Sequence, residues 1–553
     1  MSDEHTAELR RLAERCFGWP ELRDEQLEAM EAVVAGHDVL AVLPTGAGKS
    51  AIYQVPTLML DGPALVVSPL LALQHDQIEG LVDNEVPEAV AVNSAQRAKE
   101  REEAWESVRS GAAAYLFLAP EQLAKDEVVT DLAELGVALV VIDEAHCVSA
   151  WGHDFRPDYL RLGSVIDRLG HPRVVALTAT AAPPVREDIV RRLGLREHRE
   201  VIASFDRPNL HLAVRRHTDD HGKREAVLAE VRALTGDPAT RGGLVYAATR
   251  RDTEFYADEL TKSGIRAAAY HAGMTGDDRT RVHQAYRDGE LDVVVATSAF
   301  GMGIDKPDVR FVVHASAPDS LDSYYQQIGR AGRDGEPAGI VLFYRPEDLS
   351  VQRFLTAAKA PEDTLDAVAR ALRSLDAPVS TEDLAEEVDA PAARRTRAVN
   401  LLEQAGVVTT GEHGEIAYAD PELPVAQARE QALEVAERHQ RLIQSRVRVF
   451  SEYADTTDCR RRHLLAYFGE QLAQPCGRCD TCEAGTASAA PADSAEFPVG
   501  DRVRHAEWGG GAVLAVDEDR LTVLFDDVGY KTLSRQAVLE NDLLRPAGTF
   551  TEA

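Results

Sequence analysis

The chain has 553 residues, of which 44% are hydrophobic and 27% charged, and its net charge at pH 7 is −32. This length predicts three or four domains with buried cores, and the ordinary apolar content excludes wholesale disorder. The acidity excludes a protein that coats nucleic acid through a generally basic surface, so any such contact must follow a local basic path. The sequence has neither an apolar run of the roughly 18 residues that a membrane helix needs nor a signal peptide, so a cytoplasmic protein without membrane contact is expected.

Two tandem α/β domains are expected in the first part of the chain. Short β-branched runs alternate with helical patterns up to about Pro208, and the alternation restarts near Leu210 and continues to Tyr344. Apolar strands that alternate with helices predict a parallel sheet covered on both faces. The predicted fold class is therefore α/β, with parallel-sheet domains at residues 1–205 and 206–358.

The rest of the chain predicts smaller modules. Three helical patterns followed by two short strands predict a winged helix at 361–420. A helical segment at 421–485 carries a late cysteine cluster, and the small polar residues 486–496 predict a flexible linker. Short strands between Gly-rich and Asp-rich turns predict a small β-barrel at 497–546. Its expected core residues are Val503, Trp508, Val513, Val523 and Phe525.

The segment LPTGAGKS closes the first strand and opens a helix, where a phosphate-binding loop belongs. A strict P-loop has glycine where Leu43 stands, but Gly46 and Gly48 still let backbone N–H groups approach phosphate. Lys49 is expected to reach the β and γ phosphates of ATP, and Ser50 to ligate Mg²⁺. The alternative is a Gly-rich turn with a surface lysine. The predicted phosphate-binding residues are Thr45, Gly46, Ala47, Gly48, Lys49 and Ser50.

Two further segments supply the charged groups of ATP hydrolysis. VVIDEAH ends another predicted strand with Asp143, which can hold Mg²⁺, and Glu144, which can orient or deprotonate the attacking water. The alternative is an acidic turn that Asp143 caps. QQIGRAGRDG carries Arg330 and Arg333, which can stabilise a transferring phosphoryl group from the second α/β domain; a solvated arginine face is the alternative. The predicted catalytic residues are Lys49, Asp143, Glu144, Arg330 and Arg333.

These motifs, in this order, resemble the RecQ family of superfamily-two DNA helicases, over about residues 15–350 and again at the cysteine cluster. The resemblance implies two RecA-like domains that hydrolyse ATP with Mg²⁺ and unwind DNA 3′→5′ in repair and recombination. FGWPELRDEQ is similar to the family's adenine-reading segment, so Trp19 is expected to stack on the base, and Arg23 and Gln26 to hydrogen-bond it. In isolation this segment would be an ordinary capped helix with an aromatic core residue.

A second similarity concerns the DNA strand. CVSAWGHDFRPDY resembles the family's aromatic-rich loop, which implies that Trp151 and Phe155 stack on bases while Arg156 meets phosphate. The alternative places Trp151 and Phe155 in the core. Further matches, among them the interdomain segment ASFDRPNL, are implied to couple the nucleotide state to the strand.

The late cysteines predict a metal site. Cys459 precedes a CGRCDTC segment that holds Cys476, Cys479 and Cys482. Four thiolates satisfy tetrahedral Zn²⁺ without an open position, so a structural zinc site is predicted. DCRRRHLLAYFGE and the following cysteines also resemble the RecQ zinc subdomain.

The accessory modules depart from the usual RecQ order, because the winged-helix pattern precedes the zinc site. Arg394, Arg395 and Arg397 open its third helix, where a recognition helix would meet phosphate, but DNA contact and protein contact are equally open for this segment. The C-terminal segment resembles the Tudor-like or SH3-like barrel that ends UvrD and PcrA helicases. That resemblance implies a docking module, for example for RNA polymerase.

The sequence therefore predicts a cytoplasmic, nucleoid-associated ATP-dependent DNA helicase that acts on single-stranded and tailed duplex DNA. The alternative is a single-strand translocase that remodels protein–DNA complexes, or acts on RNA, with weak unwinding. A non-catalytic zinc and winged-helix regulator is disfavoured by the presence of Lys49, Asp143, Glu144 and Arg333.

Overall fold

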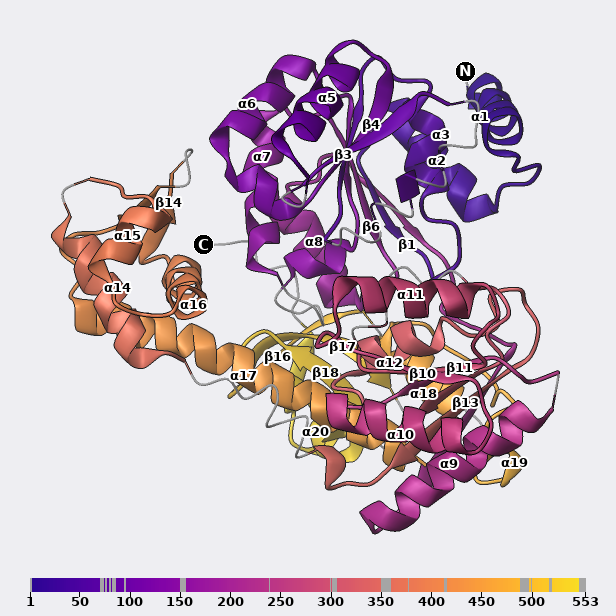
Figure 1. Ribbon diagram of the computed structural model, residues 1–553. Helices are drawn as coiled ribbons and strands as arrows, with labels where there is room; N and C mark the ends of the chain where they lie inside the picture. Colours follow the sequence, from indigo (N-terminus) through magenta and orange to yellow (C-terminus); the bar gives the residue numbers. More distant parts are fainter. Residues whose placement is uncertain are drawn as a thin grey trace.

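Two α/β domains lie in tandem, as the strand pattern predicts. The computed structural model describes residues 2–69, 74, 77–78, 81, 86–93, 96–149, 156–237, 239–298, 300, 306–349, 360–375, 377–411, 415–487, 497–498, 500–516 and 520–546. Figure 1 shows the first domain in indigo and purple, the second in magenta, and the accessory segments in orange and yellow. Within these described ranges, none of the helices combines the length and the apolar character that crossing a membrane requires.

The first domain is built on a sheet of parallel strands in the order β3-β4-β2-β5-β6-β1-β7. Its strands are β1 (Val39–Val42), β2 (Ala64–Val67), β3 (Glu88–Val92), β4 (Ala113–Leu118), β5 (Leu139–Ile142), β6 (Arg173–Thr178) and β7 (Arg199–Ile202). Its helices are α1 (Ser2–Phe17), α2 (Asp24–Ala35), α3 (Ala51–Thr57), α5 (Ala98–Arg109), α6 (Asp126–Leu135), α7 (Leu162–Arg168) and α8 (Pro183–Leu193), with 3₁₀ helices η1 (Pro120–Ala124), η2 (Ala145–Val148) and η3 (Pro157–Arg161). Strands β1 and β5 are buried throughout, as expected of a sheet covered on both faces. Because the strands are parallel, the loops after β1 and β5 leave the sheet at the same edge, with β6 between them.

The second domain repeats this architecture with parallel strands in the order β10-β11-β9-β12-β13-β8. Its strands are β8 (Leu210–Arg216), β9 (Gly243–Tyr246), β10 (Ala267–Tyr270), β11 (Val293–Ala296), β12 (Phe311–His314) and β13 (Ala338–Tyr344). Its helices are α9 (Asp220–Gly236), α10 (Arg250–Lys262), α11 (Gly276–Arg287) and α12 (Leu321–Ile328). The loop between α12 and β13 carries the predicted arginines.

The chain that follows folds as three helices and a hairpin, the arrangement predicted for a winged helix. These elements are α14 (Glu362–Ser374), α15 (Thr381–Glu387), α16 (Ala392–Gln404) and the antiparallel strands β14 (Val408–Thr410) and β15 (Ile416–Tyr418). They enclose a separate core that includes Leu365, Leu402 and Ile416. The 31-residue helix α17 (Val425–Asp455) adds Val435 to this core and then runs to the rest of the molecule (Figure 1).

A five-stranded antiparallel sheet, consistent with the expected small barrel, follows residues 459–485, which carry the late cysteines and which we call the zinc segment. Its strand order is β19-β18-β17-β16-β20. The elements are α18 (Arg460–Tyr467), α19 (Asp480–Glu483), β16 (Arg502–His505), β17 (Gly509–Val516), β18 (Arg520–Phe525), β19 (Gly529–Ser534), α20 (Arg535–Glu540) and β20 (Leu544–Pro546). The expected core is confirmed: Val503, Val513, Val523 and Phe525 are buried, and Trp508 is partly buried against them. Most of the predicted linker, residues 488–496, lies outside the described residues.

One face of this barrel packs on the rest of the molecule. Leu514, Leu524 and Tyr530 belong to the same buried cluster as residues of both α/β domains. The ring of Tyr530 stacks on Tyr467 of α18, with 5.6 Å between the ring centroids. At Gly529, which has a φ of +74°, a Cβ would lie only 2.4 Å from the Oγ of a serine on α17. The barrel is therefore fixed against α17 and α18.

Candidate functional site

The predicted P-loop lies between the end of β1 and the start of α3. Gly46 and Gly48 adopt φ angles of +81° and +70°, in the left-handed region that favours glycine. A Cβ on Gly48 would also meet the Nε2 of Gln26 at 2.6 Å. Backbone conformation and crowding thus both explain why this loop needs glycines, as a loop that wraps phosphate does.

Lys49 is half-buried and lies near the two predicted carboxylates. Its Nζ donates to the backbone oxygen of Leu43 at 3.3 Å. Burial lowers the pKa of Lys49 from its ordinary value, while the nearby carboxylates of Glu144 and Asp143 act in the opposite direction. The structure therefore brings the predicted lysine and both predicted carboxylates into one electrostatic cluster.

The two carboxylates follow β5 directly. Asp143 accepts a hydrogen bond from the backbone N–H of Glu144 at 3.0 Å and one from the Oγ of Ser68 at 3.4 Å. Burial and the neighbouring Glu144 raise the pKa of Asp143 to about 7, while Lys49 acts to lower it. Glu144 itself has a φ of +50°, a strained conformation for a residue with a Cβ and one that is common at functional sites. Asp143 follows β5, which lies two positions from the P-loop strand β1 in the sheet, and its buried carboxylate is the kind of oxygen donor that Mg²⁺ prefers.

The adenine segment is held against the P-loop. Trp19 is half-buried and stacks on Phe17, with 4.7 Å between the ring centroids. The Oε1 of Gln26 accepts from the backbone N–H of Arg23 at 2.9 Å, and its Nε2 donates to the backbone oxygens of Ala47 and Gly48, each at 3.0 Å. The amide of Gln26 therefore bonds backbone groups here, and its contact with adenine stays a prediction.

The predicted arginines come from the loop after α12. The side chain of Arg333 packs on Gly46, since a Cβ there would lie 3.1 Å from its Cδ. Arg330 is only 3% exposed and lies beside Tyr246 of its own domain. The structure thus separates the pair, with Arg333 on the P-loop and Arg330 within the second domain.

A cavity of about 290 Å³ opens between the two domains at this point. It is lined from the first domain by the P-loop and Arg23, and from the second by Arg333 and its loop. Five residues of the segment that joins the domains also line it, among them Arg207 and Asn209. Sequence similarity to the RecQ family indicates that segment, ASFDRPNL, as a whole, but it assigns no separate role to Arg207 or Asn209.

The described residues that were predicted to contact DNA lie in two separate parts of the molecule, the first α/β domain and helix α16. Trp151 and Phe155 lie outside the described residues. The Nη1 of Arg156 donates to the backbone oxygen of Pro69 at 3.2 Å. In the winged-helix segment Arg394 is exposed, the guanidinium of Arg395 donates to the backbone oxygen of Ala390, and Arg397 is half-buried. The three arginines of α16 therefore do not form one outward row.

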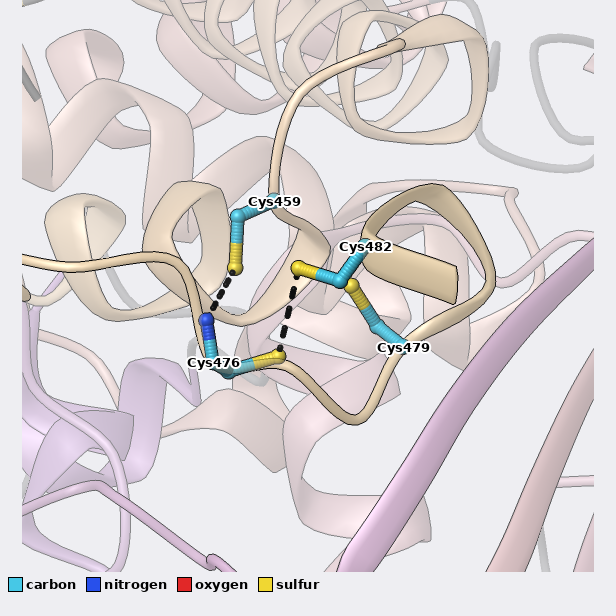
Figure 2. A group of neighbouring side chains, drawn as sticks. All are labelled: Cys459, Cys476, Cys479 and Cys482. Atoms are coloured by element: carbon cyan, nitrogen blue, oxygen red, sulfur yellow. Dashed lines mark hydrogen bonds between the residues drawn. The ribbon is translucent and has the colours of Figure 1, made fainter. Parts of the chain in front are cut away.

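The four cysteines converge as a metal site requires (Figure 2). Their sulfur atoms all lie within 4.8 Å of one another, and those of Cys476 and Cys482 are 3.9 Å apart. Tetrahedral zinc with Zn–S bonds of about 2.3 Å places sulfurs about 3.8 Å apart, so the cluster fits Zn²⁺. The Sγ of Cys459 accepts from the backbone N–H of Cys476 at 3.3 Å. The predicted zinc site is confirmed as a four-cysteine cluster.

This zinc site is attached to the second sheet. Cys479 forms a parallel bridge with Leu212 of β8, and the carboxylate of Asp480 accepts from the backbone N–H of Val214 at 2.8 Å. The zinc segment therefore continues the edge of that sheet.

Comparison with known proteins agrees with this geometry. Residues 23–189 match the DEAD/DEAH box helicase family, residues 223–335 the helicase conserved C-terminal domain, and residues 425–483 the RecQ zinc-binding domain. Among solved structures, the DUF1998 helicase MrfA bound to DNA has a TM-score of 0.53 at 21% identity, covering 76% of this chain and 60% of its own. Mss116p bound to ssRNA and AMP-PNP has a TM-score of 0.53 at 18% identity, covering 67% and 84%. Both likenesses show the fold alone, two domains that are each built on a parallel sheet.

Relatives narrow the class further. ATP-dependent DNA helicase RecQ of Bacillus subtilis is 31% identical over 542 residues, which are 97% of this chain and 77% of that protein. RecQ of Haemophilus influenzae is 35% identical over 84% of this chain and 62% of its own length. The probable ATP-dependent DNA helicase RecS of B. subtilis is 41% identical over 61% of this chain and 66% of its own length, so the matches span less than two thirds of these last two relatives. The chain belongs to the RecQ family.

Proposed function

We propose that the protein is an ATP-dependent DNA helicase that hydrolyses ATP between its two α/β domains and moves 3′→5′ along single-stranded DNA. The observation that carries this proposal is the position of Arg333, which packs on Gly46 of the P-loop from the other side of the cleft. Because the guanidinium of Arg333 belongs to the second domain, the rate of hydrolysis depends on the relative position of the two domains, as a motor requires.

Each group of the site has a role in this proposal. The P-loop and Lys49 hold the phosphates, and Ser50 and Asp143 are the residues that would hold Mg²⁺, which neutralises phosphate charge when bound. Glu144 orients the attacking water and accepts its proton. Arg333 stabilises the charge that develops on the transferred phosphoryl group, and Arg330 supports the loop from within its domain. Trp19, Arg23 and Gln26 hold the adenine.

DNA is the proposed substrate, since the RecQ relatives are named as DNA helicases. The strand would cross both α/β domains, with Trp151 and Phe155 stacked on bases and Arg156 on phosphate. Among the arginines of α16, the exposed Arg394 is best placed to reach a phosphate. With DNA as its substrate, the protein is proposed to act at the nucleoid, in the cytoplasm.

The C-terminal barrel is proposed to bind a protein such as RNA polymerase. The start of β19, at Gly529 and Tyr530, is already occupied by α17 and α18, so a partner has to use another part of the surface. A hollow of about 830 Å³ where the end of β19 and α20 meet α17 is lined by Arg520, Arg535, Leu539 and Glu452, and Leu539 is 44% exposed. Two arginines against one glutamate, beside an exposed leucine, support an acidic, partly apolar peptide as the partner.

Strand separation on tailed duplexes tests the main proposal. We expect ATP-dependent unwinding of a duplex with a 3′ single-stranded tail and none with a 5′ tail, with Lys49→Ala as the inactive control. ATP hydrolysis that DNA stimulates without strand separation would support the translocase alternative instead. Stronger stimulation by RNA than by DNA would refute the DNA assignment.

A further inference from the structure

The segment that joins the two α/β domains, residues 203–209, contacts the loop that carries Arg333. We call residues 329–337, between α12 and β13, the arginine loop. The Nη2 of Arg207 donates to the backbone oxygens of Ala331 at 2.8 Å and Gly332 at 2.9 Å, and its Nη1 to that of Gly329 at 3.4 Å. One guanidinium thus binds the carbonyls on both sides of Arg330 and just before Arg333.

Asn209 holds the same loop from the next turn of the joining segment. Its Nδ2 donates to the backbone oxygens of Gly332 at 2.8 Å and Glu336 at 2.9 Å. Gly332 has a φ of +57°, and a Cβ there would lie 2.4 Å from this same Nδ2. The amide therefore fills the space that a side chain at Gly332 would need, and it bridges the residue before Arg333 to the end of the loop.

The joining segment is itself held from its other side by the zinc segment. Glu470 accepts from the backbone N–H of Phe205 at 2.7 Å and from the Oγ of Ser204 at 2.6 Å. The rings of Phe205 and Phe468 stack with 4.6 Å between their centroids. The guanidinium of Arg461 donates to the backbone oxygen of Leu210 at 2.7 Å. Contacts at both ends fix the backbone from which Arg207 and Asn209 extend.

From this geometry we propose that Arg207 and Asn209 are positioning residues that set the reach of Arg333 into the ATP cleft. The inference rests on the proposed function, because it concerns the same hydrolysis. Neither side chain needs to touch the nucleotide: the five hydrogen bonds named above all end on backbone oxygens of the arginine loop. Loss of these bonds releases the loop while the P-loop, Lys49 and Glu144 stay in place.

Two near-isosteric variants of the full-length protein test the assignment. Asn209→Asp keeps the size but replaces the donor that faces two carbonyls with an acceptor, and Arg207→Lys keeps the charge but removes the fork. We expect the rate of single-turnover ATP hydrolysis to fall by about 10²-fold, the effect of a displacement of about 1 Å, with the affinity for a non-hydrolysable ATP analogue unchanged. Combined with Arg333→Ala, which by itself should cost about 10³-fold, either variant should cause no further loss.

Arg345→Ala is the matched control. Arg345 pairs with Asp348 at 2.8 Å in the same domain but beyond the opposite end of β13, so its loss should leave hydrolysis unchanged while thermal denaturation reports any cost to folding. Wild-type hydrolysis in both positioning variants, a weaker nucleotide affinity at an unchanged rate, or losses that multiply with Arg333→Ala would each overturn the inference. A wild-type protein that does not hydrolyse ATP would instead refute the proposed function.

Discussion

Replacement of Tyr530 by alanine should detach the C-terminal barrel from the rest of the molecule. This side chain is only 1% exposed, and its ring lies at 22° to that of Tyr467. Its hydroxyl is 2.8 Å from the hydroxyl of Tyr467, which in turn donates to Asp322 of α12. Truncation of a buried aromatic side chain costs about 3–5 kcal/mol, whereas Tyr530→Phe keeps the ring and removes only the hydroxyl, whose neutral hydrogen bond with Tyr467 is worth about 0.5–1.5 kcal/mol.

Hydrogen exchange at the amides of β18 and β19 measures this difference locally, which matters because a chain of several domains does not unfold in one step. We expect these amides to exchange about 10²- to 4 × 10³-fold faster in Tyr530→Ala and about tenfold faster or less in Tyr530→Phe. Leu539→Ala, on the exposed side of the same barrel, should change the opening free energy by less than about 0.5 kcal/mol. Unchanged exchange in Tyr530→Ala would refute the view that this ring fixes the barrel.

Four further results are expected. Lys49→Ala should abolish DNA-stimulated hydrolysis and Arg333→Ala should slow it about 10³-fold with nucleotide binding intact; normal hydrolysis in Arg333→Ala would refute the role of the second domain. Elemental analysis should find one zinc per chain. Cys479→Ser should unfold the region around this residue, since zinc binding at such sites contributes about 10–16 kcal/mol to the free energy of folding. A metal-free, soluble wild type would contradict this prediction. In a plot of the logarithm of the affinity for single-stranded DNA against the logarithm of the salt concentration, each phosphate contact should add about −0.7 to the slope. A slope near zero would contradict the helicase proposal. Replacement of Arg394, Arg395 and Arg397 of α16 together should flatten that slope if the winged-helix segment contacts DNA. It should leave the slope unchanged if the segment binds protein.

The sequence predicted those parts of the site that short segments carry. Lys49 and Asp143 each follow a β-branched strand, and the ends of parallel strands meet at one edge of a sheet, so their proximity follows from local patterns. The zinc cluster was predictable because its spacing suits tetrahedral coordination. Gln26 shows the limit of this reasoning: its motif indicates adenine, a contact that stays a prediction, but does not indicate the hydrogen bonds of its amide to the P-loop backbone.

Contacts between distant segments could not be predicted in this way. Arg207 is separated by 124 residues from the carbonyl of Ala331 that it binds, and Tyr467 by 63 residues from Tyr530. Hydrophobic periodicity reports which face of a helix or strand is buried, and it does not identify the group that is packed against that face. An arginine that binds backbone carbonyls also leaves no pattern in the partner's sequence, since every residue offers a carbonyl.

Helix α12 connects these distant contacts to the chemistry. Asp322 accepts from Tyr467 of the zinc segment, Tyr324 accepts from the hydroxyl of Tyr453 of α17 at 3.1 Å, and Tyr325 donates to the backbone oxygen of Phe205 at 2.8 Å. These three contacts lie within one turn of α12, and its last residue leads directly into the arginine loop. The zinc segment, α17 and the joining segment therefore all contact the short helix whose last residue precedes the arginine loop. The zinc site and the ATP cleft, which are far apart in the sequence, therefore share one packed connection through the second domain.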